Sequence, residues 1–341
     1  MGPSAAAIDN STRLFEVPSA LCPLSTMAQV IKLATGEMMP QVGLGTWQSP
    51  PGQVYEAVKC AINVGYRHID CAFSYENEHE IGTALAEKFT SATVRREEMF
   101  ITSKLWLTYM RPELVREGCL KSLKNLQLEY LDLFLIHAPV ALQPSKQILP
   151  MDKTGKIIFD DVDYIDTWKA MEKLVDEGLC KSIGVSNFNE EQLCRLLSVA
   201  KHPVSVNQVE CHPYLTQQKL MNFCKSNDIV LTAYSPLGCP GRPWKFKDND
   251  PRLLEDPVLL DIGKSYNKTP GQVLIRYHIE RGNVVIPKSV NENRIKENFQ
   301  VFDFKLSEDD LGKLNGLDRN YRVVNFAFLR KQKHFPFKSH L

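Results

Sequence analysis

The chain has 341 residues, of which 43% are hydrophobic and 24% are charged, and its formal net charge at pH 7 is +1. This composition is typical of a globular protein in water, and the balanced charge excludes a general attraction to nucleic acid or to an anionic membrane. No segment approaches the ~20 apolar residues that a membrane helix requires. The length allows two ordinary domains or one large α/β barrel.

Nine cysteines are scattered along the chain without a CxxC pair. An odd number of dispersed cysteines favours reduced thiols over a disulfide framework, so we expect a reducing compartment, the cytoplasm. Residues 79–83 begin like a zinc-protease motif but lack its second histidine, and we predict no metal site.

The N-terminal segment, residues 1–26, mixes Ser, Ala and Pro. Glu16, Pro18 and Pro23 interrupt any apolar run long enough for a signal-peptide core. We therefore interpret residues 1–26 as a flexible extension and residues 27–341 as a single domain.

The first predicted elements form a hairpin, because the strand-like residues 28–33 and 38–42 flank the polar turn at Gly36. Short apolar strands then alternate with amphipathic helices, the pattern of parallel β/α units. Eight strands are predicted over residues 43–45, 68–71, 99–104, 131–137, 182–185, 204–210, 229–234 and 284–287. Helices are predicted over residues 54–63, 78–88, 111–125, 164–177, 190–199, 217–226 and 292–299.

Eight strands with helical crossovers predict a (β/α)₈ TIM barrel with an N-terminal β-hairpin and large loops on its C-terminal face. The competing fold is a doubly wound sheet, which normally carries an early glycine-rich phosphate turn. Gly43-Leu44-Gly45 begins such a turn, but Gln48 occupies the place of its third glycine. The barrel is therefore favoured.

Four side chains of complementary chemistry follow the predicted strands. Asp70, Lys104 and His137 lie at strand ends, and Tyr75 lies on the loop after the second strand. The C-terminal strand ends of such a barrel form its active face. A free tyrosine titrates near pH 10, so we expect the Lys104 cation to stabilise its anion, Asp70 to hold the lysine, and His137 to orient a carbonyl oxygen. This constellation predicts carbonyl reduction.

A second polar group follows the last predicted strand. Lys288, Ser289 and Arg294 offer charge and donors beside a helix N-terminus, where an anion such as phosphate is favoured.

Six segments carry signatures of one known family: residues 65–75, 102–106, 135–137, 184–188, 207–214 and 286–290. Together they resemble the aldo-keto reductase family, in the family's order and over the chain from about residue 28. Within that family they are most similar to the aldose reductase, aldehyde reductase and hydroxysteroid dehydrogenase branch.

This resemblance implies an NADPH-dependent (β/α)₈ enzyme in which Asp70, Tyr75, Lys104 and His137 form the catalytic tetrad, with Tyr75 as the general acid. It implies that Ser186, Asn187 and Gln208 bind the nicotinamide carboxamide and that Tyr234 stacks on its ring; taken alone, Ser186 and Asn187 fit a helix cap before Glu190. Further implied cofactor residues are Thr46 and Trp47, Ser235 and Leu237 at the pyrophosphate, Lys288, Ser289, Val290 and Arg294 near the 2′-phosphate, and Glu297 and Asn298 at the adenine.

The resemblance also implies an apolar substrate pocket. Its implied lining residues are Trp47, Tyr75, Trp106, His137 and Trp244, with Phe73 and Val140 as possible neighbours, whereas Trp168 is expected in the core. Loops 141–163 and 321–341 are expected to select substrates.

Some positions depart from the family pattern. Ala138 stands where the branch usually has a large apolar residue, so either the pocket is roomier or the following loop fills the space. Cys239 and Gly241 replace a common serine and aspartate, which predicts a weaker contact closing over the cofactor, and Asn291 replaces a common threonine.

The predicted activity is the NADPH-dependent reduction of aldehydes and ketones by a monomer. A specialised sugar-derivative or hydroxysteroid oxidoreductase is the alternative within enzymes. His137 stands where steroid double-bond reductases of the family carry glutamate, which disfavours that reaction. The alternative outside enzymes is a protein that binds the cofactor without catalysis, such as a crystallin-like protein or a channel-associated subunit.

Overall fold

The computed structural model describes residues 29–244 and 250–338. The predicted extension, residues 1–26, lies outside the described residues. The described chain opens with the expected hairpin, in which β1 (Val30–Lys32) pairs antiparallel with β2 (Met38–Pro40). Gly36 in the connecting turn has a φ of 95°, a conformation that glycine adopts at no steric cost.

A single parallel sheet follows the hairpin, with its strands hydrogen-bonded in the order of the sequence, from β3 to β10. Bridges between Val42 and Val285 and between Gly45 and Lys288 join its two ends, so the predicted barrel is confirmed. The strands are β3 (Leu44–Gly45), β4 (His68–Asp70), β5 (Phe100–Leu105), β6 (Leu131–Ile136), β7 (Cys180–Ser186), β8 (Val204–Glu210), β9 (Val230–Tyr234) and β10 (Val284–Val285).

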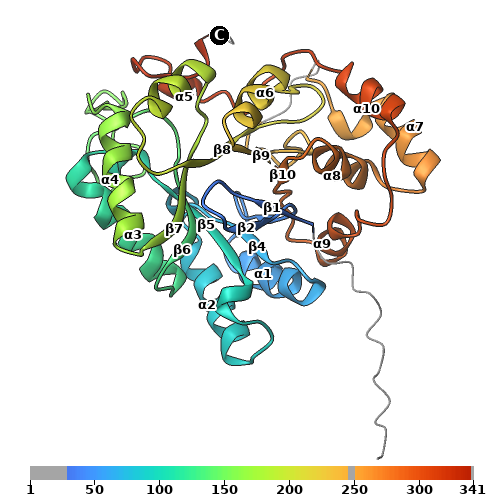
Figure 1. The fold of residues 1–341 in the computed structure, drawn as a ribbon, viewed down its shortest axis with the longest axis horizontal. Coiled ribbons are helices and arrows are strands. Elements are labelled where there is room, and N and C mark those ends of the chain that lie inside the picture. The colour runs from blue at the N-terminus through green and yellow to red at the C-terminus, as the bar shows by residue number, and fades with distance from the viewer. Residues whose placement is uncertain (1–28, 245–249, 339–341) are drawn as a thin grey trace, which may run out of the picture.

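Helices surround this barrel, and the hairpin lies within their ring (Figure 1). Seven helices lie where the sequence predicts them: α1 (Gln53–Val64), α2 (Glu78–Thr90), α3 (Pro112–Leu126), α4 (Tyr164–Asp176), α5 (Glu190–Leu197), α6 (Gln218–Ser226) and α9 (Glu292–Phe299). Three more were not predicted: α7 (Pro257–Tyr266), α8 (Pro270–Glu280) and α10 (Glu308–Asn315).

Two of the unpredicted helices, α8 and α10, lack a clear apolar stripe. In α8 every residue from Gln272 to Ile279 is buried, so polar and apolar positions do not alternate at the helical period. In α10 only Leu314 is buried. Their starts carry capping signals instead, since the side chains of Thr269 and Ser307 each accept a backbone N–H of the following turn.

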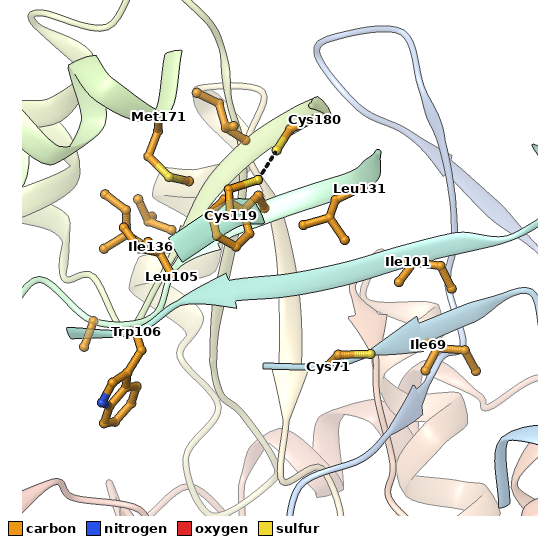
Figure 2. Close-up of a cluster of buried hydrophobic side chains, with 14 of the residues drawn as sticks. Ile69, Cys71, Ile101, Leu105, Trp106, Cys119, Leu131, Ile136, Met171 and Cys180 are labelled. Carbon is orange, nitrogen blue, oxygen red and sulfur yellow. Dashed lines mark hydrogen bonds between the residues drawn. The ribbon is translucent and has the colours of Figure 1, made fainter. Parts of the chain in front are cut away.

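The apolar core has an outer and an inner part. The outer part lies between the strands and the helices; Figure 2 shows a portion of it, in which the sulfur atoms of Cys119 and Cys180 lie 3.8 Å apart. In the inner part, Leu33 and Met39 of the hairpin pack against residues that point into the barrel, among them Phe100 and Leu133. The hairpin thus closes the N-terminal end of the barrel.

The eight cysteines within the described ranges are free thiols, as the sequence predicts for them. Over the same ranges no helix has the length and apolar character needed to cross a membrane, and no three His, Cys, Asp or Glu side chains are grouped so as to hold a metal ion.

Candidate active site

The four predicted catalytic side chains converge at the C-terminal end of the barrel. Lys104 Nζ donates to Asp70 Oδ1 at 2.6 Å, to the carbonyl oxygen of Cys71 at 2.8 Å and to the Tyr75 hydroxyl at 3.3 Å. The Lys104 side chain is fully buried. All three ammonium hydrogens are therefore used, and the lysine joins the carboxylate to the phenol.

Strand alternation explains why these groups meet. Successive side chains of a parallel strand point to opposite faces. Ser103 points outward and donates to Glu78 Oε1 at 2.6 Å, whereas its neighbour Lys104 points inward to Asp70. Gln208 on β8, across the barrel, donates to Asp70 Oδ2 at 2.7 Å. Both oxygens of Asp70 are thus held from different strands.

The pKa of the Tyr75 phenol depends mainly on its burial. Burial raises the pKa of Tyr75 well above 10, and the charge of Asp70 raises it further. The Lys104 ammonium contacts the hydroxyl, as the sequence predicts, but burial is the largest influence on the pKa of the phenol. Tyr75 consequently stays protonated at neutral pH, which is the form that a proton donor requires.

His137 faces the tyrosine at the same end of the barrel. Burial, assisted by the nearby Lys104 cation, lowers the pKa of His137 well below 6.5, so the imidazole is neutral. Its ring lies edge-on between the rings of Tyr75 and Trp106, at centroid distances of 5.8 and 5.2 Å. Ser74 Oγ lies 3.5 Å from Nδ1. Ser74 was not predicted, because a serine before a tyrosine carries no signal of its own in the sequence.

A cavity of about 840 Å³ opens beside these side chains. Its volume lies within the range of small-molecule sites. Three predicted residues, Lys104, Glu297 and Asn298, do not line it; the carboxylate of Glu297 instead accepts from Thr269 Oγ1 at 2.5 Å. The following predicted residues line the cavity: Asp70, Tyr75 and His137, the tryptophans Trp47, Trp106 and Trp244, and Thr46, Ser186, Asn187, Gln208, Tyr234, Ser235, Leu237, Lys288, Ser289, Val290 and Arg294.

Amide and hydroxyl groups form one wall of the cavity. Ser186 Oγ donates to the carbonyl oxygen of Gln208 at 2.8 Å, and Asn187 Nδ2 donates to the carbonyl oxygen of His137 at 2.9 Å. The Tyr234 hydroxyl donates to Asn187 Oδ1 at 2.8 Å. The helix-cap interpretation of Ser186 and Asn187 was wrong, because Asn189 accepts from Gln192 N and caps α5.

Positive charge gathers at another side of the cavity. Burial, together with the nearby Arg294 cation, lowers the pKa of Lys288, whose ammonium donates to the carbonyl oxygen of Gln48 at 2.9 Å. Within residues 29–244 and 250–338, neither Lys288 nor Arg294 forms an ion pair with a carboxylate. Asn291 caps α9 by accepting from the Arg294 N–H at 3.0 Å. Two cations at a helix start without an acidic partner fit a phosphate group.

Apolar side chains form the remaining side. The rings of Trp47 and Trp244 lie 6.5 Å apart, and Trp106 Nε1 donates to the carbonyl oxygen of Ile148 at 2.7 Å. The lining also includes Leu149 and the C-terminal residues 323–328. Both loops expected to select substrates therefore reach the cavity, although their individual contact residues were not predicted.

Ala138 does not leave a gap in this side. It is only 4% exposed and is not part of the cavity lining, whereas Ile148 and Leu149 of the following loop are. These positions agree with the alternative in which the following loop supplies the wall, rather than with an open space at Ala138. Phe73 and Val140 also lie outside the lining; Phe73 packs edge-on against Tyr109, and Trp168 is fully buried, as predicted.

A closed (β/α)₈ barrel with a buried Lys-Asp-Tyr group beside a cavity defines an oxidoreductase of carbonyl and alcohol groups. The model of the aldo/keto reductase family matches residues 34–319, and the chain belongs to this family.

Individual relatives agree with this assignment. The chain is 51% identical to aldo-keto reductase family 1 member A1-A of Danio rerio, over 91% of this chain and 99% of the relative. It is 47% identical to estradiol 17 beta-dehydrogenase 5 of Mus musculus, over 92% and 99%. The solved aldose reductase of Schistosoma japonicum superposes with a TM-score of 0.86 at 45% identity, covering 92% of this chain and all of that structure.

Proposed function

We propose that this chain reduces aldehydes and ketones to alcohols with NADPH as the hydride donor and Tyr75 as the proton donor. The observation that carries the proposal is the buried Lys104 ammonium, which contacts both Asp70 and the hydroxyl of Tyr75 at the edge of the cavity. A cation at this position stabilises the phenolate that remains after proton transfer.

When bound, the reduced nicotinamide supplies a hydride to the carbonyl carbon. Tyr75 gives its hydroxyl proton to the carbonyl oxygen, so the product is a neutral alcohol and the phenol becomes an anion. The neutral imidazole of His137 orients the same oxygen by hydrogen bonding, and with Tyr75 it stabilises the developing negative charge. Asp70 balances the charge of Lys104 when Tyr75 is protonated.

The residues that would hold the cofactor follow from the cavity walls. Ser186, Asn187 and Gln208 offer the amide and hydroxyl groups that suit a carboxamide, and the ring of Tyr234 offers a stacking surface. Lys288 and Arg294 suit the 2′-phosphate that distinguishes NADPH from NADH, because two cations favour a phosphomonoester over a free hydroxyl. We accordingly propose a preference for NADPH.

We also propose that the enzyme acts as a monomer in the cytoplasm on a small carbonyl compound. The free thiols of the described cysteines support a reducing compartment. Gel filtration with light scattering measures the oligomeric state, and a mass near that of a dimer would contradict the proposal.

The test of function is the loss of NADPH absorbance with a panel of small aldehydes, aromatic ketones, aldose sugars and ketosteroids. The panel includes sugars and steroids because two relatives are named as an aldose reductase and an estradiol dehydrogenase. We expect turnover of several carbonyl compounds with NADPH and weaker turnover with NADH. Tight NADPH binding without turnover of any compound would favour a non-enzymatic role and contradict the proposal.

A further inference from the structure

A second buried carboxylate lies at the active end of the barrel and takes no part in the chemistry described above. Glu210 is the last residue of β8, two positions after Gln208, and its side chain is fully buried. It does not line the cavity. A buried carboxylate without a catalytic task requires partners that offset its desolvation.

Those partners belong largely to the C-terminal segment. Glu210 Oε1 accepts the backbone N–H of Val323 at 2.6 Å, and Oε2 accepts that of Val324 at 2.8 Å. His212 Nε2 lies 2.9 Å from Oε1 and completes the set. Burial alone would raise the pKa of Glu210, but the bonds from His212 and the C-terminal segment, with the nearby Arg322 cation, hold this pKa below its ordinary value.

The two valines begin the stretch that borders the cavity. Residues 323–328 all line it, and Phe328 at their far end is 46% exposed. A second anchor follows this stretch, where Gln192 Nε2 donates to the carbonyl oxygen of His334 at 2.8 Å. The lining stretch is therefore a loop fixed at both ends, and Glu210 holds the end at residues 323–324.

We infer that Glu210 is a positioning residue for substrate size: its carboxylate fixes residues 323–324 and thereby sets the place of the apolar wall formed by residues 325–328. This inference rests on the proposed function. Large carbonyl compounds that reach this wall depend on Glu210, whereas small aldehydes held between Tyr75 and His137 do not.

Glu210→Gln tests this role with little change in volume. One carboxylate oxygen becomes an NH₂ group. This group faces either a backbone N–H or the ring N–H of His212, and an NH₂ group cannot accept a hydrogen bond from these donors. Because hydrogen bonds to charged groups are the stronger ones, we expect KM for a four-ring ketosteroid to rise about tenfold. For propanal we expect kcat and KM to stay within about twofold of the parent values.

Glu172→Gln is the matched control. Glu172 is also buried and its Oε1 also accepts two backbone N–H groups, from Lys201 at 2.6 Å and His202 at 3.0 Å, together with the indole N–H of Trp168 at 3.0 Å. Those residues precede β8, at the opposite end of the barrel from the cavity. Both variants lower Tm, but only Glu210→Gln is expected to change the ratio of the two KM values.

Hydrogen exchange provides a reading that does not need turnover. The amides of residues 323–324 are expected to exchange faster in Glu210→Gln and at the parent rate in Glu172→Gln. An unchanged KM ratio, or unchanged exchange at these amides, would overturn the inference. If the parent protein reduced no carbonyl compound, the proposed function would fail, and the exchange experiment would still decide whether Glu210 anchors the segment.

Discussion

Two buried aspartates at opposite ends of the barrel form similar ion pairs. At the N-terminal end, Asp132 at the start of β6 pairs with Arg96 at 2.7 Å and accepts the backbone N–H of Ile101 at 2.9 Å. At the C-terminal end, Asp70 at the end of β4 pairs with Lys104 at 2.6 Å. Both aspartate side chains are at most 5% exposed.

The surroundings of the two pairs differ. Arg96 also donates to the carbonyl oxygens of Met99 and Tyr130, and Lys181 lies 3.5 Å from the second oxygen of Asp132, so the partners of this pair all belong to the fold itself. Lys104 gives one bond to the hydroxyl of Tyr75, which lines a cavity. A buried ion pair therefore serves stability where none of its partners reaches a cavity, and chemistry where one partner can exchange a proton with a ligand.

The largest effect is expected from Tyr75→Phe, which removes the exchangeable proton. We expect kcat for carbonyl reduction to fall by about 10²–10⁴-fold, the usual contribution of a general acid, with NADPH affinity unchanged. Steady-state kinetics and NADPH fluorescence titration measure the two quantities. The matched control is Tyr109→Phe, because the Tyr109 hydroxyl also accepts from a lysine, Lys121 at 2.7 Å, but lies outside the cavity. Parent-like turnover by Tyr75→Phe would make the proposed mechanism wrong.

Asp132→Asn tests the ion pair at the N-terminal end of the barrel. Removing one partner of a buried pair leaves the other charge uncompensated, so we expect the free energy of unfolding to fall by about 3 kcal/mol in urea titration. The kcat of the folded variant should match the parent. Asp70→Asn is the counterpart, for which we expect kcat to fall because Lys104 is no longer held. Equal losses of activity in both variants would remove the distinction between the two ends.

His68, at the start of β4, is expected to make the free energy of unfolding depend on pH. Burial lowers the pKa of His68 to about 4, and the imidazole contacts Pro40 O and Thr102 Oγ1. Since the unfolded chain takes up this proton near pH 6.5, the contribution of His68 is complete above pH 6.5 and is lost as the pH falls towards 4, by up to ~3 kcal/mol. His68→Gln should flatten the urea-unfolding free energy over this range. Parallel pH profiles for parent and variant would contradict the assignment.

A smaller effect is expected at the cationic side of the cavity. Arg294→Ala should weaken NADPH binding about tenfold, as expected for one charge-assisted contact to phosphate, and should leave NADH binding unchanged. Lys296→Ala is the control on the same helix, because Lys296 pairs with Glu292 at 2.6 Å and does not line the cavity. Equal losses for both cofactors would show that Arg294 does not recognise the 2′-phosphate.

The sequence allowed prediction of the barrel and of the convergence of Asp70, Lys104 and His137, because strand alternation and the shared face of parallel strand ends are local rules. The place of Tyr75 was predictable because the loops that follow the strands lie on the same face as the strand ends. The direction of its pKa was not, because it depends on how deeply neighbouring elements bury the phenol. α8 escaped prediction because a helix buried on most sides shows no periodicity.

The contacts of Glu210 could not be predicted from the sequence. Its partners, Val323 and Val324, are more than a hundred positions away along the chain and offer only backbone N–H groups. Such bonds do not depend on the side chains of the two valines, so no residue pattern connects the end of β8 with the C-terminal segment. The same holds for Ile148 and Leu149, whose place beside Trp106 depends on the course of a long loop.

The hairpin of β1 and β2 closes the barrel at the end opposite the cavity. Because Leu33 and Met39 fill the base of the barrel, the cavity cannot be deepened from below without exposing the inner core. Its size and shape can change only at the rim, where loops rather than strands supply the lining. Engineering of this protein towards longer substrates should therefore alter residues 141–160 and 321–330, which leaves the interior of the barrel untouched.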